Sequence, residues 1–141
     1  GSIYFTSKAG GKARAGQIFR LDISDGTLQM IFEAAGHDSF TGPDNIVVSP
    51  QGSLMICEDR LGMFTEAQYI AGLSGQGDLF AFCQTNPQID VVYAGHDLRR
   101  TALGSEWAGA CFSADGQWMF ANLYSPGITF AITGPWLEGP V

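Results

Sequence analysis

Two stretches of the sequence decide the fold: GPDNIVVSPQGSLMICED, residues 42–59, and SEWAGACFSADGQWMFANL, residues 105–123. Each begins with acidic or amide side chains and continues as an apolar run, a turn that starts at a serine, and a second apolar run. The two turns start at Ser49 and Ser113, which lie 64 residues apart. A unit that recurs at such a spacing indicates structural repeats that stack on one another.

The rest of the chain also consists of short strand-like segments. They are rich in β-branched and aromatic residues and are separated by turns of Gly, Pro, Asp and Ser. Only residues 65–73 could form a short helical turn, and their Tyr and Ile suit a strand equally well. We therefore predict an all-β chain, with strands near residues 2–7, 17–23, 28–34, 45–50, 53–59, 68–73, 78–83, 90–95, 109–114, 117–123 and 127–134.

The repeat predicts a partial β-propeller. A second echo, EAAGHDSF at 33–40 and VYAGHDLRR at 92–100, suggests loops that lead to the next inner strand. We expect about two and a half to three four-stranded antiparallel blades. These are an incomplete blade at 1–41 without its inner strand, a full blade with its connecting loop at 42–104, and an incomplete C-terminal blade at 105–141. Because propellers close with about four to eight blades, we expect either a piece of a longer protein or copies that complete a ring together.

The chain is acidic, with seven Lys and Arg, fourteen Asp and Glu, and a net charge of −7. Such a surface repels nucleic-acid phosphates and anionic lipids, so roles at nucleic acid or at a membrane surface are disfavoured. An anionic substrate would need a local cation, for which a bound metal ion is the natural candidate. No apolar run is long enough to span a membrane, and we identify no signal peptide.

Cysteine and histidine do not form a recognisable site. Cys57, Cys83 and Cys111 form no CxxC pair and have no histidine nearby, and we expect Cys57 and Cys111 to be buried free thiols within strands. His37 and His96 lie in polar loops beside aspartate, where a structural role is favoured over that of a ligand or base.

Carboxylates stand at the entrances and exits of the repeated strands. Asp44 and Asn45 enter one predicted inner strand, and Glu106 enters the next. Oxygen ligands that converge from successive blades suit Ca²⁺, which takes about six to eight of them. Asp44 and Asn45 could instead form a turn by bonding to their own backbone. Glu58 and Asp59 follow an apolar run and could be ligands or simply polar strand ends.

The two opening stretches, together with SPGITFAITGPW at 125–136, resemble the PhoX-type alkaline phosphatase family. IYFTS followed by QIFRLD also resembles the family strands that precede PDN. The resemblance covers nearly all of this chain, but only the C-terminal part of a family member. It implies a six-bladed propeller, exported to the periplasm or secreted, that hydrolyses phosphate monoesters with a calcium and iron (Ca²⁺, Fe³⁺) cluster in its channel. From the matching motifs, the resemblance implies that Asn45 and Glu106 are the leading candidates for metal ligands. Asp44 and Glu58 are the next candidates.

The chain also departs from the family pattern. Family members carry an Arg-Pro-Glu segment just upstream of the first strand here, and their cysteine ligand for iron lies further N-terminal, so Cys57 is not that ligand. Arg60 in CEDR replaces the glycine of the CEDG seen in many relatives. We expect the isolated chain to lack a complete active site, so whether it is itself an enzyme is left open. The alternatives are a non-catalytic, calcium-stabilised propeller module for binding or assembly, and a six-bladed, lactonase-like hydrolase.

Overall fold

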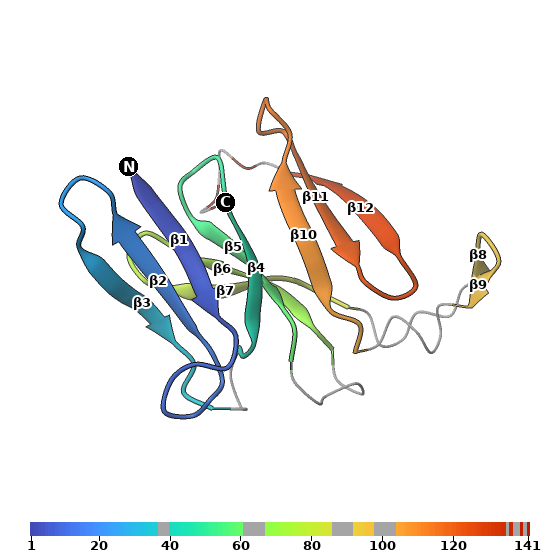
Figure 1. Ribbon diagram of the computed structural model, residues 1–141. Coiled ribbons are helices and arrows are strands. Elements are labelled where there is room, and N and C mark those ends of the chain that lie inside the picture. The colour runs from blue at the N-terminus through green and yellow to red at the C-terminus, as the bar shows by residue number, and fades with distance from the viewer. Residues whose placement is uncertain are drawn as a thin grey trace.

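The computed structural model describes residues 1–36, 40–60, 67–85, 92–97, 104–134, 136, 139 and 141. Within them the chain forms three antiparallel sheets of three or four strands, plus one short hairpin, and almost no helix (Figure 1). The all-β prediction is confirmed. The three sheets are consistent with propeller-like blades in an arc that is not closed, while the division of the chain at 41 and 104 stays a prediction.

Each sheet is built from strands that follow one another in the sequence. The first sheet contains β1 (Ser2–Ser7), β2 (Gln17–Asp22) and β3 (Leu28–Glu33). The second sheet contains β4 (Pro43–Val48), β5 (Leu54–Glu58), β6 (Tyr69–Leu73) and β7 (Leu79–Gln84). The third sheet contains β10 (Trp107–Phe112), β11 (Trp118–Leu123) and β12 (Ile128–Thr133). The hairpin pairs β8 (Val92–Tyr93) with β9 (His96–Asp97).

The second sheet lies between the other two and is covered on both faces. In β5, Met55 and Cys57 belong to the apolar cluster shared with the third sheet, whereas Leu54 and Ile56 belong to the cluster shared with the first. All five residues of β5 are buried. A strand that is covered on both faces needs a continuous apolar run rather than an alternating one, which is the reason for the sequence LMIC.

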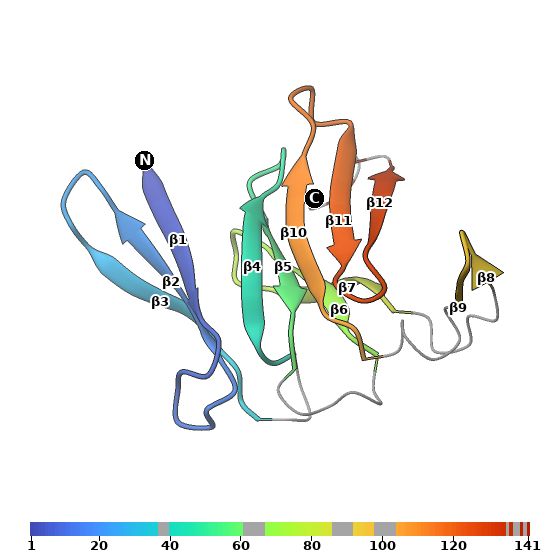
Figure 2. The same cartoon turned by 45° about the vertical axis from the view of Figure 1, so that its right-hand side comes forward.

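The first strand of each sheet faces the centre of the arc. β4 contacts β1 on one side and β10 on the other, and Figure 2 shows these three strands side by side. The expectation that the first blade lacks its inner strand is therefore wrong, because β1 itself occupies the inner position. The chain then passes from β3 to β4, and among the described residues no fourth strand lies outside β3 in this sheet.

The first sheet presents an apolar face away from the second. Cross-strand pairs align Phe5 with Phe19 and Phe19 with Met30, and the two phenyl rings stack with centroids 5.3 Å apart. Phe5 and Met30 are both exposed.

In the described part of the chain, no helix is long and apolar enough to cross a membrane.

Candidate metal centre

The inner strands of the three sheets meet where β4 begins. The hydroxyl of Thr6 in β1 donates a hydrogen bond to the backbone carbonyl of Asp44 over 2.9 Å. On the other side of β4, the backbone N–H of Gly109 in β10 donates to the side-chain oxygen of Asn45 over 2.6 Å. Asp44 and Asn45 therefore lie at the junction of all three sheets.

Both β4 and β10 are bulged at this junction. The pairing of β4 with β5 shifts between Pro43 and Ile46, and the pairing of β10 with β11 shifts around Gly109, whose φ is 59°. A bulge takes residues out of the ladder and redirects their side chains. Because Asn45 and Gly109 are 64 residues apart, the hydrogen bond between them joins equivalent places in the two repeats.

Three carboxylates converge at the junction. Oxygen atoms of Asp44, Asp59 and Glu106 all lie within 4.8 Å of one another, and all three residues are half-buried. Asp44 belongs to β4, Asp59 follows the last residue of β5, and Glu106 precedes the first residue of β10. Carboxylates this close repel one another in water, so the arrangement favours a cation between them.

Close backbone packing fixes the position of this carboxylate cluster. The N–H of Asp59 donates to the carbonyl of Gly42 over 2.9 Å, and the N–H of Gly42 donates to the carbonyl of Ala15 over 2.7 Å. Gly42 has a φ of 60° and leaves no room for a Cβ beside the carbonyl of Asp59. Gly16 likewise packs directly against the ring of Pro43. Glycine is needed at Gly42 for both its backbone angle and this close approach.

A lysine from the first sheet reaches the carboxylate cluster. The ammonium of Lys8, one residue after β1, forms an ion pair with the carboxylate of Asp59. The two side chains are 32% and 22% exposed. Three carboxylates and one ammonium leave a formal charge of −2, which one divalent cation would balance.

Glu58 plays a different part from its neighbour Asp59. Its side chain is completely buried, and its Oε1 accepts hydrogen bonds from the backbone N–H of Thr41 (3.0 Å) and from Nε of Arg60 (2.7 Å). Its Oε2 accepts a bond from the backbone N–H of Tyr69 over 2.9 Å. The carboxylate therefore ties the approach to β4 to the start of β6. The family resemblance names Glu58 and not Asp59 as a ligand, whereas Asp59 is the one of the two that lies with Asp44 and Glu106. Glu58 as a metal ligand stays a prediction.

The other predicted residues fall outside the carboxylate cluster. Cys57 is buried as expected, and burial raises the pKa of its thiol to about 12. Cys111, in contrast, is exposed, so the expectation that it is buried is wrong. It pairs across the strand with the exposed Phe120, on the face of the third sheet that points away from the second. His37 lies outside the described residues, and the side chain of His96 is not described either.

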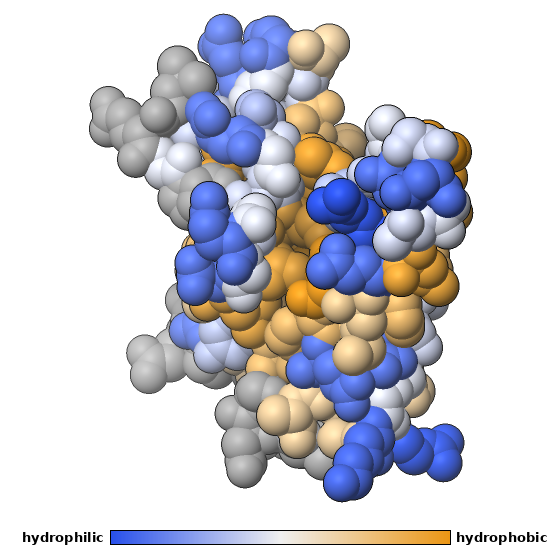
Figure 3. Space-filling view, turned by 90° about the vertical axis from the view of Figure 1, so that its left-hand side faces the viewer, coloured by the Kyte–Doolittle hydropathy of each residue, from blue (hydrophilic) through white to orange (hydrophobic). Residues whose placement is uncertain are grey.

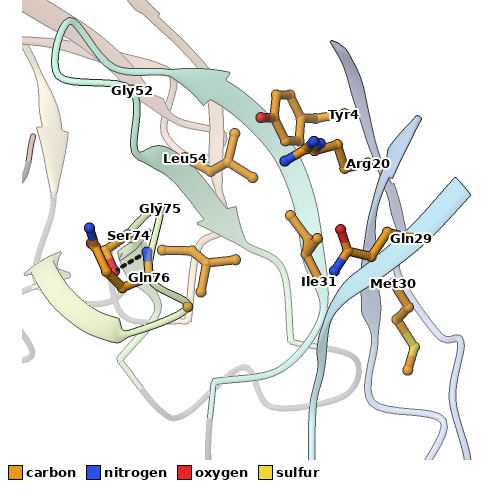
Figure 4. A pocket seen from close by; sticks show the side chains of 12 residues that line it. Tyr4, Arg20, Gln29, Met30, Ile31, Gly52, Leu54, Ser74, Gly75 and Gln76 are labelled. Carbon is orange, nitrogen blue, oxygen red and sulfur yellow. Dashed lines mark hydrogen bonds between the residues drawn. The ribbon is translucent and has the colours of Figure 1, made fainter. Parts of the chain in front are cut away.

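A cleft separates the first and second sheets at the end opposite the carboxylate cluster. Figure 3, which faces the first-sheet side of the molecule, shows apolar atoms along a hollow between polar surfaces. The cleft has a volume of about 350 Å³ and is bordered by the turns at 49–53 and 74–78 (Figure 4). Its lining mixes apolar and polar side chains, among them Tyr4, Arg20, Gln29, Ile31, Leu54, Leu73, Ser74 and Gln76.

In a comparison with models of protein families, one family model matches most of this chain. The family model described as alkaline phosphatase PhoX matches residues 1–127 of the 141. The match contains all three members of the carboxylate cluster and Lys8. A search of curated proteins finds no significant match.

Proposed function

This chain belongs to the alkaline phosphatase PhoX family, and we propose that it is the part of a metal-dependent phosphatase that supplies metal ligands for the hydrolysis of phosphate monoesters. The observation that carries the proposal is the convergence of Asp44, Asp59 and Glu106 from three separate segments onto one point at the centre of the arc. The three carboxylates and the ammonium of Lys8 carry a formal charge of −2, which a bound divalent cation would balance.

The residues fit a hard divalent cation such as Ca²⁺. Carboxylate oxygens are the ligands that Ca²⁺ prefers, and the half-buried position limits competition from bulk water. Asn45 and Glu58 stay predictions as ligands, since their side-chain oxygens already accept hydrogen bonds within the protein. To bind a cation, Asn45 would have to give up one hydrogen bond, whereas Glu58 would have to give up three. Asn45 is therefore the more readily available ligand of the two.

For iron, the described residues offer carboxylate oxygens alone. In the part of the chain that the structure describes, the cluster contains carboxylates and no thiol or imidazole. Cys57 lies in the apolar cluster with Met55 and Ile70, and burial holds the pKa of its thiol at about 12, so thiolate formation there is disfavoured. A thiolate or imidazole ligand for iron in this family member would therefore have to come from beyond the described residues.

A divalent cation bound at this centre would stabilise negative charge on the phosphoryl group and assist ionisation of an attacking water. The protein's own residues then have three tasks. Asp44, Asp59 and Glu106 fix the position of the charge, the Gly42 backbone fixes Asp59, and the bulged strands hold the three sheets in register around the centre.

The centre supplies three carboxylates, whereas Ca²⁺ takes about six to eight oxygens. We propose that the remaining ligands come from other blades, either of a longer chain or of a second copy that completes the propeller. The same shortfall favours one alternative, in which the isolated chain binds calcium for stability and does not catalyse hydrolysis. Export to the periplasm or cell exterior is proposed from family membership alone.

Calorimetric titration of the chain with calcium tests the metal centre. We expect binding that is abolished or weakened at least about tenfold by Asp44→Asn and by Glu106→Gln, because each removes a charged ligand. Asp78→Asn is the matched control, since Asp78 lies in the turn at the opposite end of the second sheet. Equal weakening by all three variants, or no binding by the unmodified chain, would contradict the assignment.

Hydrolysis of p-nitrophenyl phosphate, with a lactone substrate in parallel, tests the reaction. Calcium-dependent release of nitrophenol would establish the phosphatase. Because we expect the isolated chain to lack a complete active site, absence of turnover is informative only when the chain is joined to the blades that complete the propeller. Calcium binding without turnover of either substrate there would support the non-catalytic alternative, and lactone turnover alone would support the lactonase-like one.

A further inference from the structure

Lys8 is the cation nearest to the carboxylate cluster. It follows the last residue of β1 and opens the β1–β2 loop, residues 8–16. Its ammonium is paired with Asp59, and about a third of its side chain is exposed (32%). Lysine carries a compact charge on a flexible stem, so this ammonium can move by several ångströms without a change in the backbone.

The loop that carries Lys8 is tied to the metal centre. The N–H of Gly10 donates to the carbonyl of Ser7 over 3.1 Å, and the N–H of Gly16 donates to the carbonyl of Gly10 over 3.0 Å. The carbonyl of Ala15 then accepts from the N–H of Gly42, the residue that packs on Asp59. Lys8 is thus held next to the centre even when its ammonium leaves the carboxylate.

The loop is also unusually basic for this chain. Of seven Lys and Arg residues, three lie within residues 8–14: Lys8, Lys12 and Arg14. Lys12 and Arg14 are exposed, and neither forms an ion pair with a residue that the structure describes. A chain with a net charge of −7 therefore gathers positive charge in the loop that carries Lys8.

The charges at the centre indicate what Lys8 does when a cation binds. A divalent ion and the ammonium of Lys8 would compete for the same carboxylate of Asp59, and their like charges repel. Without Lys8, three carboxylates and one divalent ion would keep a net charge of −1, which repels an incoming phosphate. With Lys8 the centre is neutral, and the displaced ammonium offers three hydrogen-bond donors beside the cation.

On the basis of the proposed function, we propose that Lys8 is the phosphate-recognising cation of this centre, held on Asp59 until a metal ion replaces it there. The proposal concerns substrate binding: the ammonium moves from a carboxylate oxygen to a phosphoryl oxygen, and no bond is made or broken. It predicts effects of opposite sign on the affinities for metal and phosphate when the charge of Lys8 is removed.

The test is calorimetric titration of the 141-residue chain and its Lys8→Gln variant, first with calcium and then, at saturating calcium, with phenylphosphonate, a phosphate-monoester analogue that is not hydrolysed. We expect Lys8→Gln to bind calcium about tenfold more tightly, because a competing charge has been removed. We expect it to bind phenylphosphonate at least about tenfold more weakly, because a charge-assisted hydrogen bond has been lost.

Two further variants distinguish a direct contact between Lys8 and the phosphonate from the general electrostatic effect of a positive charge in this loop. Lys12→Gln removes the same charge from the same loop without touching the carboxylate cluster, and we expect both affinities to stay within about twofold of the unmodified chain, because exposed charges are screened by salt. Lys8→Arg keeps the charge, and we expect it to retain most of the phenylphosphonate affinity. Far-ultraviolet circular dichroism checks that all variants are folded.

Weaker binding of both calcium and phenylphosphonate by Lys8→Gln would show that Lys8 merely positions Asp59, and would overturn the proposal. Unchanged phenylphosphonate affinity, or equal losses in Lys8→Gln and Lys12→Gln, would overturn it as well while leaving the metal centre intact. No calcium binding by the unmodified chain would instead overturn the metal centre itself, and with it the exchange on Asp59.

Discussion

Replacing Glu58 by glutamine should reveal whether this carboxylate stabilises the fold or binds metal. Glu58 is fully buried, with one oxygen accepting from Thr41 and Arg60 and the other from Tyr69. Glutamine has nearly the same shape but only one acceptor oxygen. Its NH₂ group must therefore face either the backbone N–H of Tyr69 or the two donors on the other side.

The magnitude follows from the bonds that are lost. A buried donor without an acceptor costs about 1–3 kcal/mol. Arg60, whose side chain is only 12% exposed, also loses its charged partner, and removal of one member of a buried pair costs about 3–5 kcal/mol at the upper end. Because the amide retains part of the network, we expect Glu58→Gln to lower the free energy of unfolding by about 2–4 kcal/mol.

The assay is urea unfolding followed by tryptophan fluorescence, in calcium and in chelator. If Glu58 is structural, the loss is the same in both. Asp44→Asn supplies the contrast: in chelator it should be neutral or stabilising, because it relieves repulsion within the carboxylate cluster, and only in calcium should it destabilise relative to the unmodified chain. A loss below about 1 kcal/mol for Glu58→Gln, or one that disappears in chelator, would refute the reasoning.

Three other predictions concern backbone packing, thiol reactivity and acid stability. Gly42→Ala should destabilise the fold by about 2–4 kcal/mol, because the added methyl group meets a backbone carbonyl, whereas Gly52→Ala, also at positive φ but with open space around it, should cost about 1–2 kcal/mol in thermal or urea unfolding. Iodoacetamide at pH 8 should label the exposed Cys111 and leave Cys57 unmodified, because burial raises the pKa of Cys57 to about 12; mass spectrometry showing equal labelling of the two would be inconsistent with the core assignment. Glu33 accepts hydrogen bonds from the backbone N–H of Lys12 and the side-chain amide of Gln17, which lower its pKa. It should therefore stabilise the fold above its ordinary pKa of 4.5 and lose that contribution as the pH falls through its lower folded value. The difference in stability between Glu33→Gln and the unmodified chain should accordingly be present at neutral pH and shrink in acid.

The exposed faces of the outer sheets fit an arc that other blades would continue. Phe5 and Met30 on the first sheet, and Trp118 and Phe120 on the third, leave apolar surface in water. Light scattering in calcium and in chelator would show whether two copies cover these faces. A calcium-dependent dimer would support completion of the propeller by a second copy, and a monomer in both conditions would favour other blades of a longer chain.

The sequence by itself determined the type of structure. Alternating and continuous apolar runs predict strands because side chains on a strand point to opposite faces, and the two serine turns mark the repeat without any knowledge of contacts. The same patterns, with the PDN, CED and SEWAGA motifs, indicate a resemblance to the PhoX-type alkaline phosphatase family. They also place Asp44, Asn45 and Glu106 near the entrances of inner strands.

Only the tertiary structure decided which polar side chains meet. Glu58 and Asp59 are neighbours after one apolar run, yet alternation sends them in different directions: Glu58 into a buried network, Asp59 into the carboxylate cluster. Lys8 is 51 residues from Asp59, and no local pattern predicts that pair. The sequence likewise suggests a first blade without its inner strand, whereas β1 lies beside β4, because the position of a sheet depends on which face it buries against its neighbour. Spacing along the chain records local conformation, whereas the site depends on how the sheets pack.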